Sequence, residues 1–167
     1  MKYIWYTIIS IFFTFTSLQA QAQWGIRGGY TYQYNSFAEV GISLITKKIK
    51  PSHDFITLSF PERVNSAFLS TEFNFNKDFV LGGKLGYEIA WVRWAPVPIT
   101  ARLSYAYYTN MATQDMRIIP EIGLNLFGVM HLTYGYNIPL QTFEFEQVSR
   151  SRVSLIITTD LGGLRHK

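Results

Sequence analysis

Strict alternation of apolar with polar or small residues is the feature that most limits how this chain can fold. In residues 79–91, one face carries aliphatic and aromatic side chains, and the opposite face carries small residues together with Lys84 and Glu88. A period of two is the spacing of a β-strand, because successive side chains point to opposite faces of a sheet. No alternative stretch of three helical turns is evident, so the sequence predicts an all-β fold.

Eight segments show this alternation, and turn-forming residues or prolines separate them. They cover residues 24–34, 37–46, 67–75, 79–91, 99–107, 118–126, 130–138 and 152–159. Residues 35–36 and 76–78 predict tight turns, whereas residues 47–65 predict the longest loop, inside which residues 55–60 could form a short strand. Polar loops are expected at residues 109–115 and 141–149. An even number of strands joined by hairpins predicts a closed antiparallel up-and-down β-barrel, with eight strands.

Proline breaks the alternation at a few places. Pro96 and Pro98 end the fourth segment, because proline cannot donate a hydrogen bond to a neighbouring strand. Pro120 falls inside the sixth segment. It therefore predicts a β-bulge or a late strand start there.

The first 22 residues have the three parts of a secretory signal peptide. Lys2 precedes an apolar run from Tyr3 to about Leu18, and Ala20-Gln21-Ala22 offers small residues for cleavage. The run is too short, and too rich in Ser and Thr, for a comfortable transmembrane helix. We therefore expect residues 1–22 to be a signal peptide and residues 23–167 to form one domain.

Composition narrows the class of protein further. The chain is 48% hydrophobic and 17% aromatic but only 16% charged, against about 25% charged residues in soluble domains. It has no cysteine, which excludes disulfides and a lipid-anchored lipoprotein. The net charge of +4 is spread along the exported chain, so nucleic-acid binding is not expected. No cofactor is indicated, and His53-Asp54 lacks the spacing of a metal site.

The residue types on the polar faces indicate which face of each strand points into the barrel. These faces combine glycine, serine and threonine with acids and bases of both signs, which can pair with one another in a narrow lumen. The predicted lumen charge network is Glu39, Glu72, Lys84, Glu88, Arg102, Glu121 and His131. The apolar faces carry aromatic residues near the strand ends, as in the two interfacial girdles of a membrane barrel. The predicted interfacial aromatics are Trp24, Phe79, Trp91, Trp94, Tyr134 and Tyr136. Together these features predict a transmembrane barrel.

The chain resembles the outer-membrane β-barrel domain proteins of Bacteroidetes-like bacteria, which belong with the small eight-stranded outer-membrane barrels. The resemblance runs from about residue 24 to 159 and rests on residues 70–73, 82–88, 120–123 and 132–137. Gly83 stands where such proteins often have proline, and Leu161 or Leu164 would replace the usual terminal aromatic. The resemblance implies a location in the cell outer membrane, with outer-membrane lipid, lipopolysaccharide and the barrel-insertion machinery as partners. It implies no active residues.

Several functions remain open from the sequence. We expect a monomeric, non-enzymatic barrel with a structural or surface-interaction role, whose lumen is plugged by the charged network. In a gated variant of this idea, Lys84, Glu88, Arg102 and Glu121 exchange partners to admit water or small ions. A second alternative is a secreted soluble β-barrel that binds a small apolar ligand.

A third alternative is a lipid-modifying enzyme of the outer membrane. Its candidate residues are Ser104, Glu121 and His131, which are predicted to face the lumen on nearby strands. A loop-based binding function would instead use the basic residues of the longest loop to contact lipopolysaccharide phosphates. These residues are Lys47, Lys48, Lys50, His53 and Arg63.

Overall fold

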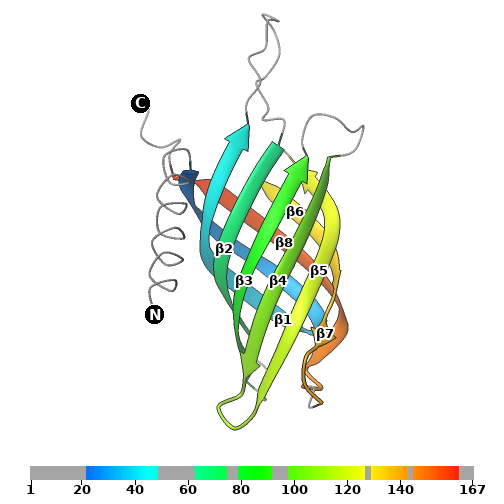
Figure 1. Ribbon diagram of the computed structural model, residues 1–167. Coiled ribbons are helices and arrows are strands. Elements are labelled where there is room, and N and C mark those ends of the chain that lie inside the picture. Colours follow the sequence, from blue (N-terminus) through cyan, green and yellow to red (C-terminus); the bar gives the residue numbers. More distant parts are fainter. Residues whose placement is uncertain are drawn as a thin grey trace, which may run out of the picture.

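The computed structural model describes residues 22–48, 63–74, 79–91, 98–126, 129–142 and 145–161, and these residues form a single antiparallel β-sheet (Figure 1). Its strands are β1 (Ala22–Lys48), β2 (Arg63–Phe73), β3 (Leu81–Trp91), β4 (Ile99–Thr109), β5 (Gln114–Leu126), β6 (Met130–Tyr136), β7 (Ile138–Pro139) and β8 (Val148–Asp160). Within these ranges, no helix is long and apolar enough to cross a membrane. The all-β prediction is confirmed.

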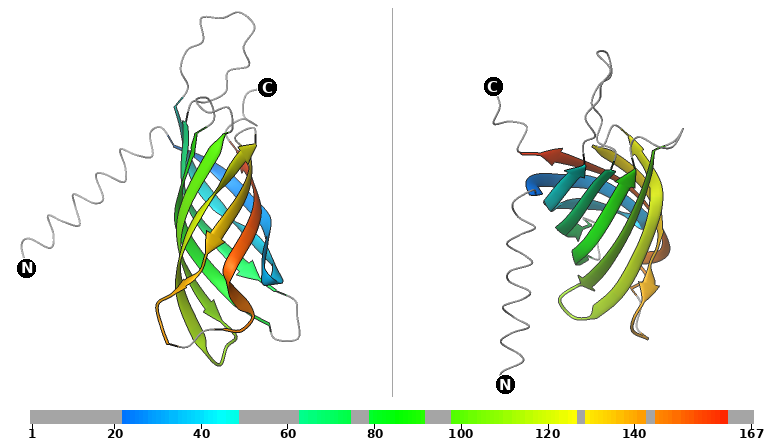
Figure 2. Two further views of the ribbon diagram at one scale, coloured as in Figure 1. Left: turned by 90° about the vertical axis from the view of Figure 1, so that its right-hand side faces the viewer. Right: turned by 45° about the horizontal axis from the view of Figure 1, so that its top comes forward.

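The sheet closes on itself. The strands are ordered β4-β3-β2-β1-β8-β6-β5-β7, and an additional pairing of β4 with β5 joins the two edges. All of the pairings are antiparallel, and Figure 2 shows the sheet curving round to meet itself. Closure removes the unpaired edges of an open sheet. The predicted closed eight-stranded antiparallel β-barrel is therefore confirmed.

β1 is one continuous element whose two halves form two neighbouring strands of the barrel wall. Its first part pairs with β8 from Gly25 to Tyr34, and its second part pairs with β2 from Ala38 to Lys48. Arg27 and Glu39 would lie about 40 Å apart in a straight strand, yet their side chains are 2.6 Å apart. The chain reverses between them, at a point where Tyr34 has a positive φ of 71°. The turn predicted at residues 35–36 accounts for this reversal.

The strands are longer than the alternation predicted. β1 continues to Lys48 and β2 begins at Arg63, so the predicted loop 47–65 was too long at both ends. The loops predicted at 109–115 and 141–149 were also too long, because β5 begins at Gln114 and β8 at Val148. Polar residues such as Arg117 and Arg152 continue the strands because they point into the barrel instead of toward solvent. The possible strand at residues 55–60 lies outside the described residues.

Pro120 interrupts the barrel wall on one side only. On the β4 side it pairs with Leu103 in an unbroken register, so the predicted bulge or late start of this strand was wrong. On the other side, β5 pairs with β6 up to Gly135 and with β7 from Ile138, and the ladder is broken between them. Proline has no N–H to donate at this point. Asn137 instead donates its backbone N–H to the carbonyl of Arg150 in β8, at 2.6 Å.

The interior of the barrel is mainly polar and the exterior mainly apolar. Among the described residues, 24 polar or charged residues are buried and only 12 hydrophobic ones. Ten of the hydrophobic residues form two clusters, one of which contains Phe37, Val80, Ala106, Tyr108, Ile119, Phe145 and Val148, and the other Ile45, Val64 and Ala90. On the outside, Leu85 and Ile122 are each 61% exposed. This distribution is the reverse of a soluble protein's, in which apolar residues fill the core.

Adjacent glycines on β3 lie on opposite faces of the barrel wall, so alanine should affect stability differently at the two positions. A Cβ at Gly82 would lie 2.6 Å from Cε1 of Tyr108, inside the barrel, whereas a Cβ at Gly83 meets nothing within 4 Å. We expect Gly82→Ala to lower the free energy of unfolding by about 1–3 kcal/mol through overpacking. Gly83→Ala should raise it by about 0.5–1 kcal/mol, because alanine loses less backbone entropy than glycine. Urea unfolding of the two variants in one detergent measures both changes, and equal destabilisation would contradict the assignment of faces.

Candidate functional site in the barrel interior

Eight buried side chains form a closed ring of alternating positive and negative charges inside the barrel. We call this set the charge ring, and its members in order are Arg27, Glu39, Lys84, Glu72, Arg152, Glu121, Arg102 and Glu88. The four carboxylates and four cations give a formal charge of zero. Each charge therefore has an opposite charge on both sides.

The first half of the charge ring joins β1, β2, β3 and β8. Arg27 Nε donates to Glu39 Oε1 at 2.6 Å. Lys84 Nζ bridges two carboxylates, with Glu39 Oε2 at 2.8 Å and Glu72 Oε1 at 2.9 Å. Glu72 Oε1 also accepts a hydrogen bond from Nη2 of Arg152. Charged hydrogen bonds of this kind are about twice as strong as neutral ones.

The second half returns through β5, β4 and β3 to β1. Arg152 Nε lies 3.5 Å from Glu121 Oε1, and Arg102 Nη1 lies 3.1 Å from Glu121 Oε2. Arg102 also contacts Glu88 Oε2 at 2.6 Å through Nη2. Glu88 Oε2 closes the ring with Nη1 of Arg27, at 3.6 Å. The ring thus connects strands that are not neighbours in the sheet.

Polar and aromatic side chains surround the charge ring. Tyr108 Oη donates to Glu72 Oε2 at 2.7 Å and accepts from Arg152 Nη1 at 3.2 Å. Thr133 and Ser154 each donate to Glu121 Oε1, at 3.1 and 3.0 Å. The guanidinium carbon of Arg27 lies 3.9 Å from the centre of the Phe68 ring, in the geometry of a cation–π contact. These groups use part of the remaining hydrogen-bonding capacity of the ring. Among the described residues, Nη1 and Nη2 of Arg27 make no hydrogen bond.

The structure buries all seven residues of the predicted lumen network and brings them together. Six of them belong to the charge ring, and the seventh, His131 on β6, places Nδ1 3.3 Å from Glu88 Oε1. The sequence-based set omitted Arg27 and Arg152, although the alternation already placed Arg27 on a polar face. Arg152 was missed because it stood at the expected start of the last strand, next to a predicted loop. Counting inward positions back from residue 158 would have found it.

Of the two cations suggested for a gate, only Arg102 contacts the two carboxylates suggested with it. Lys84 contacts Glu39 and Glu72, whereas Arg102 contacts Glu88 and Glu121. Each cation is already shared by two carboxylates. An exchange of partners would have to break two charged contacts at once, so the arrangement favours a fixed plug.

The three residues suggested for catalysis do not meet in a nucleophile–base arrangement. His131 faces Glu88, and Glu121 is bound by Arg102, Thr133 and Ser154. Ser104 is buried on β4 opposite Gly86 and Ile119, and its Oγ has no hydrogen-bond partner among the described residues. Nucleophilic catalysis requires the hydroxyl and its base within about 3 Å of each other. Among the described residues there is likewise no group of three potential metal ligands.

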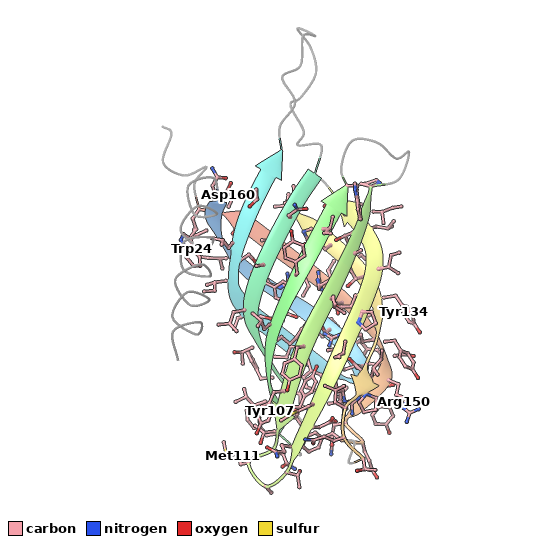
Figure 3. All side chains as sticks on the ribbon, viewed as in Figure 1. Trp24, Tyr107, Met111, Tyr134, Arg150 and Asp160 are labelled. Atoms are coloured by element: carbon pink, nitrogen blue, oxygen red, sulfur yellow. The ribbon has the colours of Figure 1, made fainter. Side chains whose placement is uncertain are left out.

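The predicted interfacial aromatics lie on the outside of the barrel wherever they are described. Trp24, Phe79, Trp91, Tyr134 and Tyr136 are all exposed, whereas Trp94 lies outside the described residues. Figure 3 shows Trp24 at the end where Asp160 lies, and Tyr107 and Met111 at the opposite end. Among the basic loop residues, Lys47, Lys48 and Arg63 are paired in strands instead of a loop, and Lys50 and His53 lie outside the described residues.

Comparison with known proteins assigns neither a family nor a function to this chain. Scans against family models, curated proteins and solved structures found no match to this chain.

Proposed function

We propose that this protein is a small transmembrane β-barrel of a bacterial outer membrane, with a structural or surface-interaction role and a lumen plugged by the charge ring. The observation that carries the proposal is the reversed distribution of side chains. On β8, for example, Val153, Leu155 and Ile157 point outward with 40–45% exposure, whereas Arg152 and Ser154 are buried. Large contiguous apolar surfaces are rare on soluble monomers, because their contact with water is unfavourable. In a membrane, the same surface would contact hydrocarbon instead of water.

Exposed tyrosines on the outer surface, of which Tyr107 lies at the end away from Trp24 and Asp160 (Figure 3), support a membrane position. Tyr107 donates its hydroxyl to Gln114 Oε1 at 2.9 Å, and Tyr134 donates to Ser151 Oγ at 3.2 Å. Each ring lies on the apolar outer surface while its hydroxyl reaches a polar neighbour. Such amphipathic rings are favoured where hydrocarbon meets water.

The polar interior disfavours the alternative of a soluble barrel that binds an apolar ligand. Such a protein would need apolar side chains around its lumen, but charged residues occupy the middle of this one. An eight-stranded barrel is also narrow enough for its own side chains to fill it. The proposed partners are accordingly outside the barrel: outer-membrane lipid, lipopolysaccharide and the barrel-insertion machinery.

Membrane fractionation with a heat-modifiability gel tests the proposal. We expect the full chain in the outer-membrane fraction, and a band whose mobility on a denaturing gel changes after boiling, because closed barrels resist detergent until heated. A freely soluble periplasmic protein would overturn the membrane assignment.

A separate prediction concerns ion conductance through the plugged lumen in planar bilayers. Because the charge ring fills the lumen with paired side chains, the purified protein should give no unitary ion conductance. Lys84→Ala removes the ammonium group that two carboxylates share, so it is the variant most sensitive to a hidden path for ions through the lumen. Stable conductance steps of the unaltered protein would contradict the plug.

A further inference from the structure

A short segment that belongs to no strand pair of the wall lies at one end of the barrel. Residues 145–147 leave the barrel wall before β8, at the end away from Trp24 and Asp160 (Figures 2 and 3). We call residues 145–147 the strap; the next residue, Val148, begins β8 and pairs with Tyr34 of β1. Phe145 is only 4% exposed, although it lies outside the strands. Its ring enters the apolar cluster that fills this end of the lumen, with Ala106 and Ile119 among its members.

Two inward-facing residues of β5 bind the backbone at the start of the strap and directly after it. Asp115 Oδ2 accepts the backbone N–H of Phe145 at 3.1 Å, and Arg117 Nη1 donates to the carbonyl of Val148 at 2.7 Å. The two clamping residues are paired with each other, since Arg117 Nη2 lies 2.6 Å from Asp115 Oδ2. Val148 also donates its backbone N–H to the carbonyl of Phe145, at 3.1 Å, which closes the strap into a turn.

The strand ladders beside the strap are short or irregular. In this part of the described chain, β7 pairs only with β5, through Pro139 opposite Arg117 and Ile138 opposite Ile118. The β1–β8 register is also irregular here, where the pairing shifts between Tyr32 and Tyr34. Moving residues 145–147 therefore breaks none of the continuous ladders that hold the barrel closed.

We propose that the strap is a removable stopper, which closes the lumen at the end away from the termini and can leave without opening the barrel wall. The groups that hold it include the apolar cluster around the Phe145 ring and the Asp115–Arg117 pair, which binds the backbone on either side of residues 146–147. Asn35 Nδ2 also donates to the carbonyl of Gln147, at 3.5 Å. Release would expose the apolar cluster and, behind it, the side of the charge ring that faces this end. Access from this end is thus controlled by the strap and not by the ring alone.

The absence of cysteine from the sequence makes a direct test possible. A thiol introduced by Ala106→Cys lies in the apolar cluster behind the strap, where Ala106 is fully buried. We expect it to react slowly with a small water-soluble methanethiosulfonate in detergent. Adding Phe145→Ala should raise its rate at least tenfold, whereas Phe145→Leu, which keeps most of the apolar contact, should raise it much less.

A second reporter distinguishes release of the strap from general loosening. Ala90→Cys places a thiol in the other apolar cluster, which does not include Phe145. Its reaction rate should stay unchanged when Phe145→Ala is added. The proposal is overturned if the position 106 thiol reacts rapidly with the strap intact, if Phe145→Ala leaves its rate unchanged, or if both reporters accelerate equally. The assay requires a folded barrel but no membrane, so its failure is distinct from failure of the proposed location.

Discussion

Lys84→Met should lower the free energy of unfolding by about 3–5 kcal/mol, even though it replaces a charge with an apolar side chain of similar length. Lys84 is the cation shared by Glu39 and Glu72, and all three side chains are fully buried. Without it, the charge ring has four carboxylates and three cations, and one negative charge is left uncompensated in the lumen. Urea unfolding in detergent or lipid vesicles measures the loss.

Two companion variants show whether charge balance is the cause. Leu85→Met changes the next residue, which points outward, and should cost less than about 1.5 kcal/mol as a near volume-conserving replacement. Adding Glu39→Gln to Lys84→Met restores three carboxylates and three cations, and should recover part of the lost stability through a coupling of about 0.5–3 kcal/mol. Purely additive effects of the two substitutions would count against a charge-balanced ring.

Leu85→Arg should destabilise the barrel by about 2–4 kcal/mol in a lipid bilayer, the cost of an arginine near the middle of the hydrocarbon. Leu85 lies in the middle of β3, 61% exposed on the outer surface. The substitution removes no internal contact of the charge ring. The expected loss therefore depends on the surrounding lipid, and folding titrations in vesicles measure it.

The matched control is Met111→Arg at the turn between β4 and β5. Met111 is 86% exposed and lies at the end of the barrel (Figure 3), so its replacement should change stability by less than about 0.5 kcal/mol. If Leu85→Arg is equally harmless in vesicles, the outer surface of the barrel does not face hydrocarbon. The comparison thus tests the membrane position independently of cell fractionation.

The alternation of residues carried enough information to predict the barrel and its faces. Lys84 and Leu85 are neighbours in the sequence, and their assignment to opposite faces follows from a period of two. The strand ends were harder to predict, because inward-facing polar residues such as Asp115 and Arg117 have the composition of a loop. Their burial depends on the opposite wall of the barrel, which a local pattern does not contain.

The pairing within the charge ring could not be predicted in the same way. Alternation identifies Glu72 as inward-facing, but its contact with Arg152 depends on strand register and on the width of the closed barrel. These two residues are 80 positions apart in the chain. The strap was missed for a related reason, since Phe145 stands in a polar segment, and its burial depends on an apolar cluster and on Asp115 that other strands supply.

The position of Arg152 in the last strand has a consequence for the order of assembly. Until β8 is in place, the other seven members of the charge ring comprise four carboxylates and three cations, and Glu72 and Glu121 lack their shared partner. The arrival of β8 neutralises the interior at the same step that joins it to β1 and β6. The charge ring is therefore completed in the same step that closes the barrel wall. A barrel that lacks its final strand has both an unpaired negative charge in the lumen and unpaired strand edges.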